Sequence, residues 1–278
     1  MIRLRRRGEN LLFNYIILTL LVLFAVGPIV MILFNSVKNR AEIGRNPLGV
    51  PHSVHWENYS EAWEIGQFGR TMRNSVILVA GTVAAELVLG GLAAYSLARK
   101  QPPGSNVVMF YMLIASTIPI WLYLVPLFFT WRTLNLLNTR LGLILIYVAL
   151  NAPFSIFLLR SYLIGLPPDF EDAARVDGAN ELQVLTRIVI PITWSGFLTV
   201  GLVVGLGVWS EFQIALIFVQ EPKLFPVTTS FFKFQERFGT NWSLTSAGAA
   251  MMIFPILILF LALQRRFIEG LAQGGIKI

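Results

Sequence analysis

The sequence is dominated by long apolar runs separated by short polar or proline-containing segments. A helix rises 1.5 Å per residue, so about 20 apolar residues cross the roughly 30 Å hydrocarbon core of a bilayer. The chain is therefore expected to be an all-α polytopic membrane protein with six transmembrane helices. The expected spans cover residues 11–34, 75–98, 107–129, 141–159, 194–219 and 244–263.

The composition agrees with a membrane protein, because 55% hydrophobic and 13% charged residues leave too little polar surface for a soluble globule. A net charge of +7 could suggest nucleic acid in a soluble protein. Here the basic residues flank apolar runs, where they orient the spans, so no nucleic-acid partner is expected. The absence of cysteine excludes disulfides, thiolate nucleophiles and cysteine metal sites.

The basic residues also suggest an orientation. The segment 1–10 carries four arginines before a run that is too long for a signal peptide and lacks an Ala-x-Ala pattern. We therefore expect a cytoplasmic N-terminus at 1–10, a first span at 11–34 and an outer loop at 35–72. A five-helix translocation core would then occupy 75–263, and a cytoplasmic tail 264–278.

A short acidic element between the fourth and fifth spans departs from the apolar character of the chain. After Pro167-Pro168, Asp169 is expected to cap a short helix, with Asp172 completing a capping-box-like pair. Glu171 and Asp172 would lie near the positive end of the helix dipole. Gly178 is expected to end the helix, and a second helix at 180–189 to lead into the next span. The residues alone allow either a docking element for a soluble partner or an ordinary amphipathic loop.

The spacing of this element resembles a known family motif. Asp172-Ala173-Ala174-x3-Gly178-x9-Ile188-x-Ile190-Pro191 is similar to the EAA motif, Glu-Ala-Ala-x3-Gly-x9-Ile-x-Leu-Pro. This motif belongs to the membrane subunits of binding-protein-dependent ABC importers. Asp172 stands in place of the glutamate, with Glu171 beside it, and Ile190 in place of the leucine.

Other stretches resemble the MalG-like branch of the carbohydrate importers in this family. They are 35–38 (NSVK), 93–99 (AAYSLAR), 134–139 (LNLLNT) and 264–271 (QRRFIEGL). The resemblance implies a type I ABC importer permease fold with six spans and both termini in the cytoplasm. It places the chain in a bacterial or archaeal plasma (inner) membrane.

The resemblance also implies a role for the region 167–191 as the coupling helix region, which is seated on an ATPase. The residues expected to serve ATPase coupling are Asp169, Glu171, Asp172, Ala173, Ala174, Asp177, Gly178, Ile188 and Pro191. The implied partners are a MalF-like second permease, a homodimeric ABC ATPase, an extracytoplasmic solute-binding protein, a sugar and membrane lipid. No cofactor is expected on this chain, because ATP and Mg²⁺ would be bound by the ATPase.

Polar and aromatic residues inside the spans are candidates for the substrate pathway, because burying them in lipid is unfavourable. Glu211 is expected mid-span in the fifth helix, in a stretch similar to the Trp-Asn-Glu-Phe common in this branch. A carboxylate and an aromatic ring there could bind sugar hydroxyls and stack on a pyranose ring. The candidates are Glu211, Trp209, Phe212, Asn151, Tyr123 and Trp121. Each of them could instead serve helix packing or face lipid.

Three alternatives to a sugar permease remain open. The solute could be another polar molecule, such as glycerol phosphate. The chain could be a secondary transporter that uses Glu86 and Glu211 as proton-coupling carboxylates, or a membrane-embedded enzyme that uses the same acids; Glu86 is otherwise expected to be structural or paired across the dimer. No phosphate loop, His-Glu-x-x-His or Gly-x-Ser-x-Gly pattern is present. A non-catalytic subunit powered by a partner ATPase is therefore expected.

Overall fold

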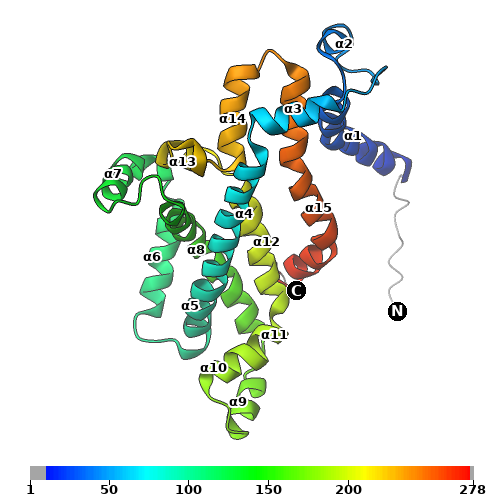
Figure 1. Cartoon of the computed structure of the whole chain (residues 1–278). Coiled ribbons are helices and arrows are strands. Elements are labelled where there is room, and N and C mark those ends of the chain that lie inside the picture. Colours follow the sequence, from blue (N-terminus) through cyan, green and yellow to red (C-terminus); the bar gives the residue numbers. More distant parts are fainter. Residues whose placement is uncertain (1–10, 276–278) are drawn as a thin grey trace. The chain divides into compact units, whose positions relative to one another are not determined.

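A computed structural model describes residues 11–275, with side chains described from Phe13 to Gln264. Every regular element in the described range is a helix (Figure 1), which confirms the all-α prediction. The predicted cytoplasmic segment 1–10 lies outside the described residues, as do the last residues of the predicted tail 264–278.

The chain divides into two compact units. Of the described residues, the first comprises those up to Phe68 together with Phe231–Phe254, and the second comprises Gly69–Ser230 and those from Pro255 onward. The boundaries cut three helices, which are α4 (Phe68–Ala85), α14 (Val227–Phe238) and α15 (Trp242–Gly275). The predicted coupling and substrate residues all belong to the second unit.

Within the described residues, four helical stretches are long and apolar enough to cross a membrane. They are Phe13–Ser36 in α1 (Leu11–Ser36), Phe68–Lys100, Arg140–Gly165 (α8) and Trp242–Gln264. Two bent helix pairs have the same apolar character. One joins α6 (Ser105–Thr117) to α7 (Ile120–Thr133) at 99°, and the other joins Glu181–Ile192 to α12 (Trp194–Ser210) at 78°. If each pair is one span, the total is the predicted six.

In the first unit, hydrogen bonds between buried polar groups hold the segment that follows α1. Lys38 is fully buried and donates from Nζ to Asn35 Oδ1 and to the Asn46 carbonyl, both at 3.0 Å. Asn58, on α3 (Glu57–Ile65), donates to the carbonyls of Ser36 and Lys38. These bonds satisfy buried donors and connect α3 to the end of α1 and to the turn before α2 (Arg40–Arg45).

The second unit is built around the helix Phe68–Lys100, which packs against α8 and α12. This helix contains α4, a π-helical turn at Glu86–Gly90, α5 (Gly91–Tyr95) and a second π-helical turn at Ser96–Lys100. Side chains from all three helices form the apolar core; fully buried members include Ala94, Leu159, Val200 and Val204.

Three span predictions need correction. The helix that contains the second span begins at Phe68, within the predicted loop 35–72. The third span was expected to kink at Pro119 and Pro126; it breaks at Pro119, which has extended backbone between α6 and α7, whereas Pro126 lies inside α7 without interrupting it. The predicted helix 194–219 is wrong, because α12 ends at Ser210 and α13 (Gln213–Phe218) begins after a break at Glu211.

Candidate functional site

The acidic element forms α9 (Asp169–Val176), which lies with α10 (Glu181–Gln183) at the end of the second unit opposite α13 (Figure 1). Its first turn contains three acids, which interact favourably with the positive end of the helix dipole. After the C-cap Asp177, Gly178 adopts a φ of +86°, a left-handed conformation that glycine adopts without strain. A tight turn therefore separates α9 from α10.

The predicted cap of this helix is wrong. Asp169 is the first helical residue, and the N-cap is Pro168, which makes no side-chain capping bond. The capping box lies at the start of α10, where Asn180 Oδ1 accepts from the Gln183 backbone N–H and Gln183 Oε1 accepts from that of Asn180, both at 2.9 Å. Asp172, the second half of the predicted box, instead pairs with Arg175 at 2.8 Å.

Glu171 is the centre of these bonds and is only 1% exposed. Its Oε1 accepts from Arg99 Nε at 2.6 Å, and its Oε2 accepts from Arg175 Nη2 at 3.2 Å. Arg99 also donates from Nη2 to the Leu166 carbonyl at 2.7 Å, at the end of α8. The ion pair thus joins α9 to the π-helical turn Ser96–Lys100. Glu171 is thus buried inside this chain, and its role in ATPase coupling stays a prediction.

A second carboxylate connects α10 to the same region. Glu181 accepts from Arg175 Nε at 3.0 Å through Oε1 and pairs with Lys100 Nζ at 3.3 Å through Oε2. The Tyr95 hydroxyl lies 3.2 Å from one oxygen of both Glu171 and Glu181. Hydrogen bonding to Glu181 raises the pKa of Arg175, so its guanidinium stays charged. We call Tyr95, Arg99, Glu171, Arg175 and Glu181 the coupling network.

The outer surface of α9 combines acids with apolar side chains. Asp169, Asp172, Ala173 and Asp177 are exposed, and Ala174 is half-buried against the core. Phe170 and Val176, which the sequence analysis did not select, are 52% and 87% exposed. Both flank Ala173-Ala174 in the sequence, and this position on the predicted helix could have marked them as candidates for a contact surface. Exposed apolar groups on an otherwise charged short helix are typical of a contact surface.

The last two predicted coupling residues, Ile188 and Pro191, lie beyond α9. Ile188 is half-buried in a third π-helical segment, Val184–Val189, which packs against α9. Pro191 is exposed in α11 (Ile190–Ile192), directly before the bend into α12. The motif therefore covers the helix, the glycine turn and the connection to the next span. Its role in coupling stays a prediction.

Glu211 occupies the break between α12 and α13 and has extended backbone, with φ −69° and ψ 131°. Its carboxylate accepts from the backbone N–H groups of Ile214 at 2.7 Å and Ala215 at 3.2 Å. These amides belong to the first turn of α13 and have no partner inside that helix. The expectation that Glu211 lies within a continuous helix was therefore wrong. The helix breaks at Glu211, and the Glu211 carboxylate accepts hydrogen bonds from the backbone amides that the break leaves without helical partners.

Tyr147 connects Glu211 to the predicted residue Asn151. The Tyr147 hydroxyl donates to Glu211 Oε2 at 2.8 Å, and Asn151 Nδ2 donates to the Tyr147 carbonyl at 2.7 Å. We call Tyr147, Asn151 and Glu211 the polar cluster. Tyr147 was not among the residues predicted from the sequence, although its spacing from Asn151 places both on one face of α8. Within the described residues, no group of three His, Asp or Glu side chains could hold a metal ion.

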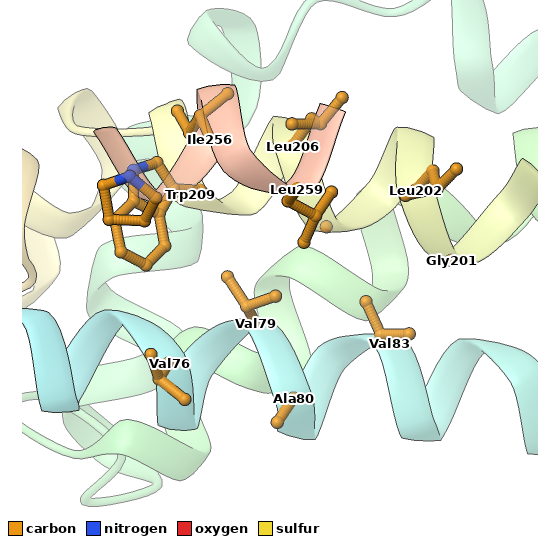
Figure 2. A pocket seen from close by; sticks show the side chains of 12 residues that line it. Val76, Val79, Ala80, Val83, Gly201, Leu202, Leu206, Trp209, Ile256 and Leu259 are labelled. Carbon is orange, nitrogen blue, oxygen red and sulfur yellow. The ribbon is translucent and has the colours of Figure 1, made fainter. Parts of the chain in front are cut away.

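The predicted aromatic residues are distributed over several sites. Trp209 lines an apolar pocket of about 400 Å³ with side chains of α4, α12 and α15, among them Val79 and Leu259 (Figure 2). Phe212 is half-buried beside Glu211. Trp121 is exposed and Tyr123 half-buried on α7, beyond the break at Pro119. Their roles in a substrate pathway stay predictions.

The comparisons with known proteins agree with this architecture. Residues 86–273 match the family described as "Binding-protein-dependent transport system inner membrane component". The diacetylchitobiose uptake system permease protein NgcG of Streptomyces coelicolor is 32% identical over 95% of this chain and 88% of its own length. The sulfoquinovosyl glycerol transport system permease protein SmoH of Agrobacterium fabrum is 32% identical over 95% and 93%.

A solved structure gives the same result at the level of the fold. A chain of a bacterial ABC transporter involved in the import of the acidic polysaccharide alginate matches with a TM-score of 0.80 and 26% identity. The match covers 92% of this chain and 95% of the other. Together with the family match over most of the chain, this similarity shows that the protein belongs to the family of inner membrane components of binding-protein-dependent transport systems and is an ABC transporter permease.

Proposed function

We propose that this chain is a transmembrane subunit of an ATP-driven importer of sugars, with an oligosaccharide as the preferred solute. Two relatives that align over nearly the whole chain are named for diacetylchitobiose and sulfoquinovosyl glycerol, both of which contain sugar units. The observation that carries the proposal is the firm connection of α9 to a membrane-spanning helix through the buried Arg99–Glu171 pair. Such a connection suits a subunit that receives motion from another protein.

In this proposal α9 is the coupling helix and lies on the cytoplasmic side, as do both termini. Phe170 and Val176 enter a groove of an ATPase subunit, while the acids around them contact its polar rim. The ATPase is a homodimer and binds ATP and Mg²⁺. A second, MalF-like permease completes the pathway, and a solute-binding protein delivers the sugar from outside.

We further propose that the polar cluster faces the sugar. A half-buried carboxylate, a tyrosine hydroxyl and an amide offer both acceptors and donors, which is the chemistry that sugar hydroxyls require. Phe212, beside Glu211, supplies an aromatic face for stacking. By contrast, the pocket lined by Trp209 is apolar throughout and offers hydroxyl groups few partners.

Reconstitution of the complete transporter tests the proposed function. The chain is co-expressed with its neighbouring permease, ATPase and solute-binding protein, and the purified complex is placed in liposomes. We expect uptake of a labelled oligosaccharide that requires both ATP and the binding protein. Uptake driven by a proton gradient, without an ATPase, would instead support the secondary transporter.

Gly178 gives a direct test of the turn after α9. Its left-handed φ is strained for other residues, by about 1–2 kcal/mol, although a side chain there would meet open space. We expect Gly178→Leu to insert and assemble normally, to displace α10 relative to α9, and to lower uptake per ATP hydrolysed about tenfold.

Gly104 offers a matched control, because it has a φ of +89° and open space around it, but lies before α6 and outside the coupling network. Gly104→Leu introduces the same type of backbone strain, and we expect it to keep normal coupling. Equal coupling in the two leucine variants would count against a special role for the turn at Gly178.

A further inference from the structure

Glu86 lies inside a membrane-spanning helix and is 1% exposed. Among the described residues, neither of its carboxyl oxygens has a hydrogen-bond partner, and the same holds for the hydroxyls of Thr82 and Ser155. Thr82 precedes Glu86 by one helical turn, and Ser155, on α8, is the hydroxyl that comes near the carboxyl group. Unsatisfied polar groups at such a place are unfavourable, so an additional role is expected.

The helices around Glu86 supply no counter-ion. α12 and α5, which pack near it, contain no charged residue. α8 contains two arginines, near its two ends, and both have other partners: Arg140 donates to Asn74 Oδ1 and Arg160 to the Leu97 carbonyl. Pairing across a dimer does not fit a carboxyl group that is buried inside its own chain.

The backbone at Glu86 is unusual as well. Glu86 begins the π-helical turn Glu86–Gly90, and single π-helical turns occur frequently at functional sites. Gly90 leaves room beside the carboxyl, since a Cβ there would lie 3.4 Å from both Glu86 Oε2 and Ser155 Cβ. Returning a π turn to α-helical geometry shifts the following residues by one position, which rotates them by about 100°. The turn therefore provides a hinge.

The helix beyond this hinge contributes two side chains, Tyr95 and Arg99, to the coupling network. Gly91–Lys100 carries Tyr95, Arg99 and Lys100, and these three side chains bind Glu171 or Glu181. The second π-helical turn, Ser96–Lys100, contains two of the three. A displacement of α9 would therefore be transmitted to the whole segment as far as the hinge at Glu86–Gly90.

We propose that Gly91–Lys100 is a lever that moves with α9, and that Glu86 is a positioning residue at its hinge. In the arrangement described here Glu86 is buried and unpaired. When the lever moves, the carboxyl group reaches water or a polar partner, which favours the displaced arrangement. This inference deepens the proposed function and depends on α9 being the coupling helix.

A single-cysteine experiment tests the movement of residue 86. The chain contains no cysteine, so Glu86→Cys reports that position alone once the subunits are separated on a gel. The complete complex, in lipid nanodiscs, is treated with a small water-soluble thiol reagent at rest and after trapping with ATP and vanadate. We expect labelling at residue 86 to rise at least fivefold on trapping. The fully buried Leu159 is the matched control, and Leu159→Cys should stay unlabelled in both states.

Protection of the introduced thiol of the Glu86→Cys variant in both states would overturn the proposal. A second variant addresses function, because Glu86→Met retains length and removes polarity. We expect it to raise the melting temperature of the resting complex and to lower uptake per ATP hydrolysed at least fivefold. Normal uptake in a stabilised variant would identify Glu86 as a core residue without a role in transport. Absence of ATP-driven uptake in the wild-type complex would overturn the proposed function itself, and this inference with it.

Discussion

Replacement of Glu171 by alanine is expected to leave the chain inserted in the membrane but to abolish most ATP-driven uptake. The side chain of Glu171 is 2% exposed and that of its partner Arg99 is 14% exposed. Removing one member of a buried ion pair leaves the other charge uncompensated, which typically costs about 3–5 kcal/mol. Arg99 would then lose its contact with α9, and the Tyr95 hydroxyl would lose one acceptor. We expect uptake per ATP hydrolysed to fall more than tenfold.

Asp172 provides a matched control from the adjacent position. Its side chain is 67% exposed and makes a single ion pair with Arg175, at 2.8 Å and three residues away on the same helix. Exposed pairs of this kind contribute about 0.2–0.5 kcal/mol. Asp172→Ala should therefore preserve the melting temperature of the complex. If the Glu171→Ala and Asp172→Ala variants showed the same uptake per ATP hydrolysed and the same melting temperature, the buried pair would have no special role.

A double-mutant cycle separates the pair from its surroundings. Arg99→Ala and Glu171→Ala each remove one partner, and the double variant removes both. Because residues in direct contact are not energetically independent, the double variant should be less destabilised than the sum of the single variants. Additive losses in melting temperature would show that the two side chains act separately.

The coupling element illustrates what could be predicted from the sequence. Proline pairs, clustered acids and a glycine predicted a short solvated helix, and α9 confirms that helix. The motif spacing assigned its acidic position to Asp172, whereas the buried acid is Glu171. The reason is tertiary, since Arg99 lies 72 positions earlier in the chain. No local pattern reports which of two adjacent carboxylates meets an arginine on another helix.

The fifth span shows the opposite case, in which hydropathy was misleading. Residues 194–219 are apolar enough to be predicted as one helix, and Glu211 is the only charged residue among them. A single carboxylate is sufficient to end α12, because it accepts from two amides of α13 and from Tyr147. The proline at 119 was a readable signal for a disruption of the third span. The 99° angle depends on packing and could not be predicted.

Replacement of Glu211 by alanine should lower sugar uptake about tenfold while the complex still assembles. The substitution removes the acceptor for the amides of Ile214 and Ala215 and for the Tyr147 hydroxyl. Each unsatisfied buried donor costs about 1–3 kcal/mol, so the start of α13 should loosen and the melting temperature should fall. A drop in uptake from this variant alone could therefore reflect local structure.

Glu211→Gln separates recognition from structure. Glutamine keeps the length: its carbonyl oxygen can accept from Ile214, its amide group can donate to the Tyr147 hydroxyl, and only the longer bond from Ala215 loses its acceptor, so α13 should largely keep its position. A carboxylate forms stronger hydrogen bonds to hydroxyl groups than a neutral amide does. We therefore expect KM for the sugar to rise about tenfold, while the melting temperature falls much less than in Glu211→Ala. Gln213→Ala, at an exposed neighbouring position, should leave KM unaltered. An unchanged KM in Glu211→Gln would limit Glu211 to holding the break between α12 and α13.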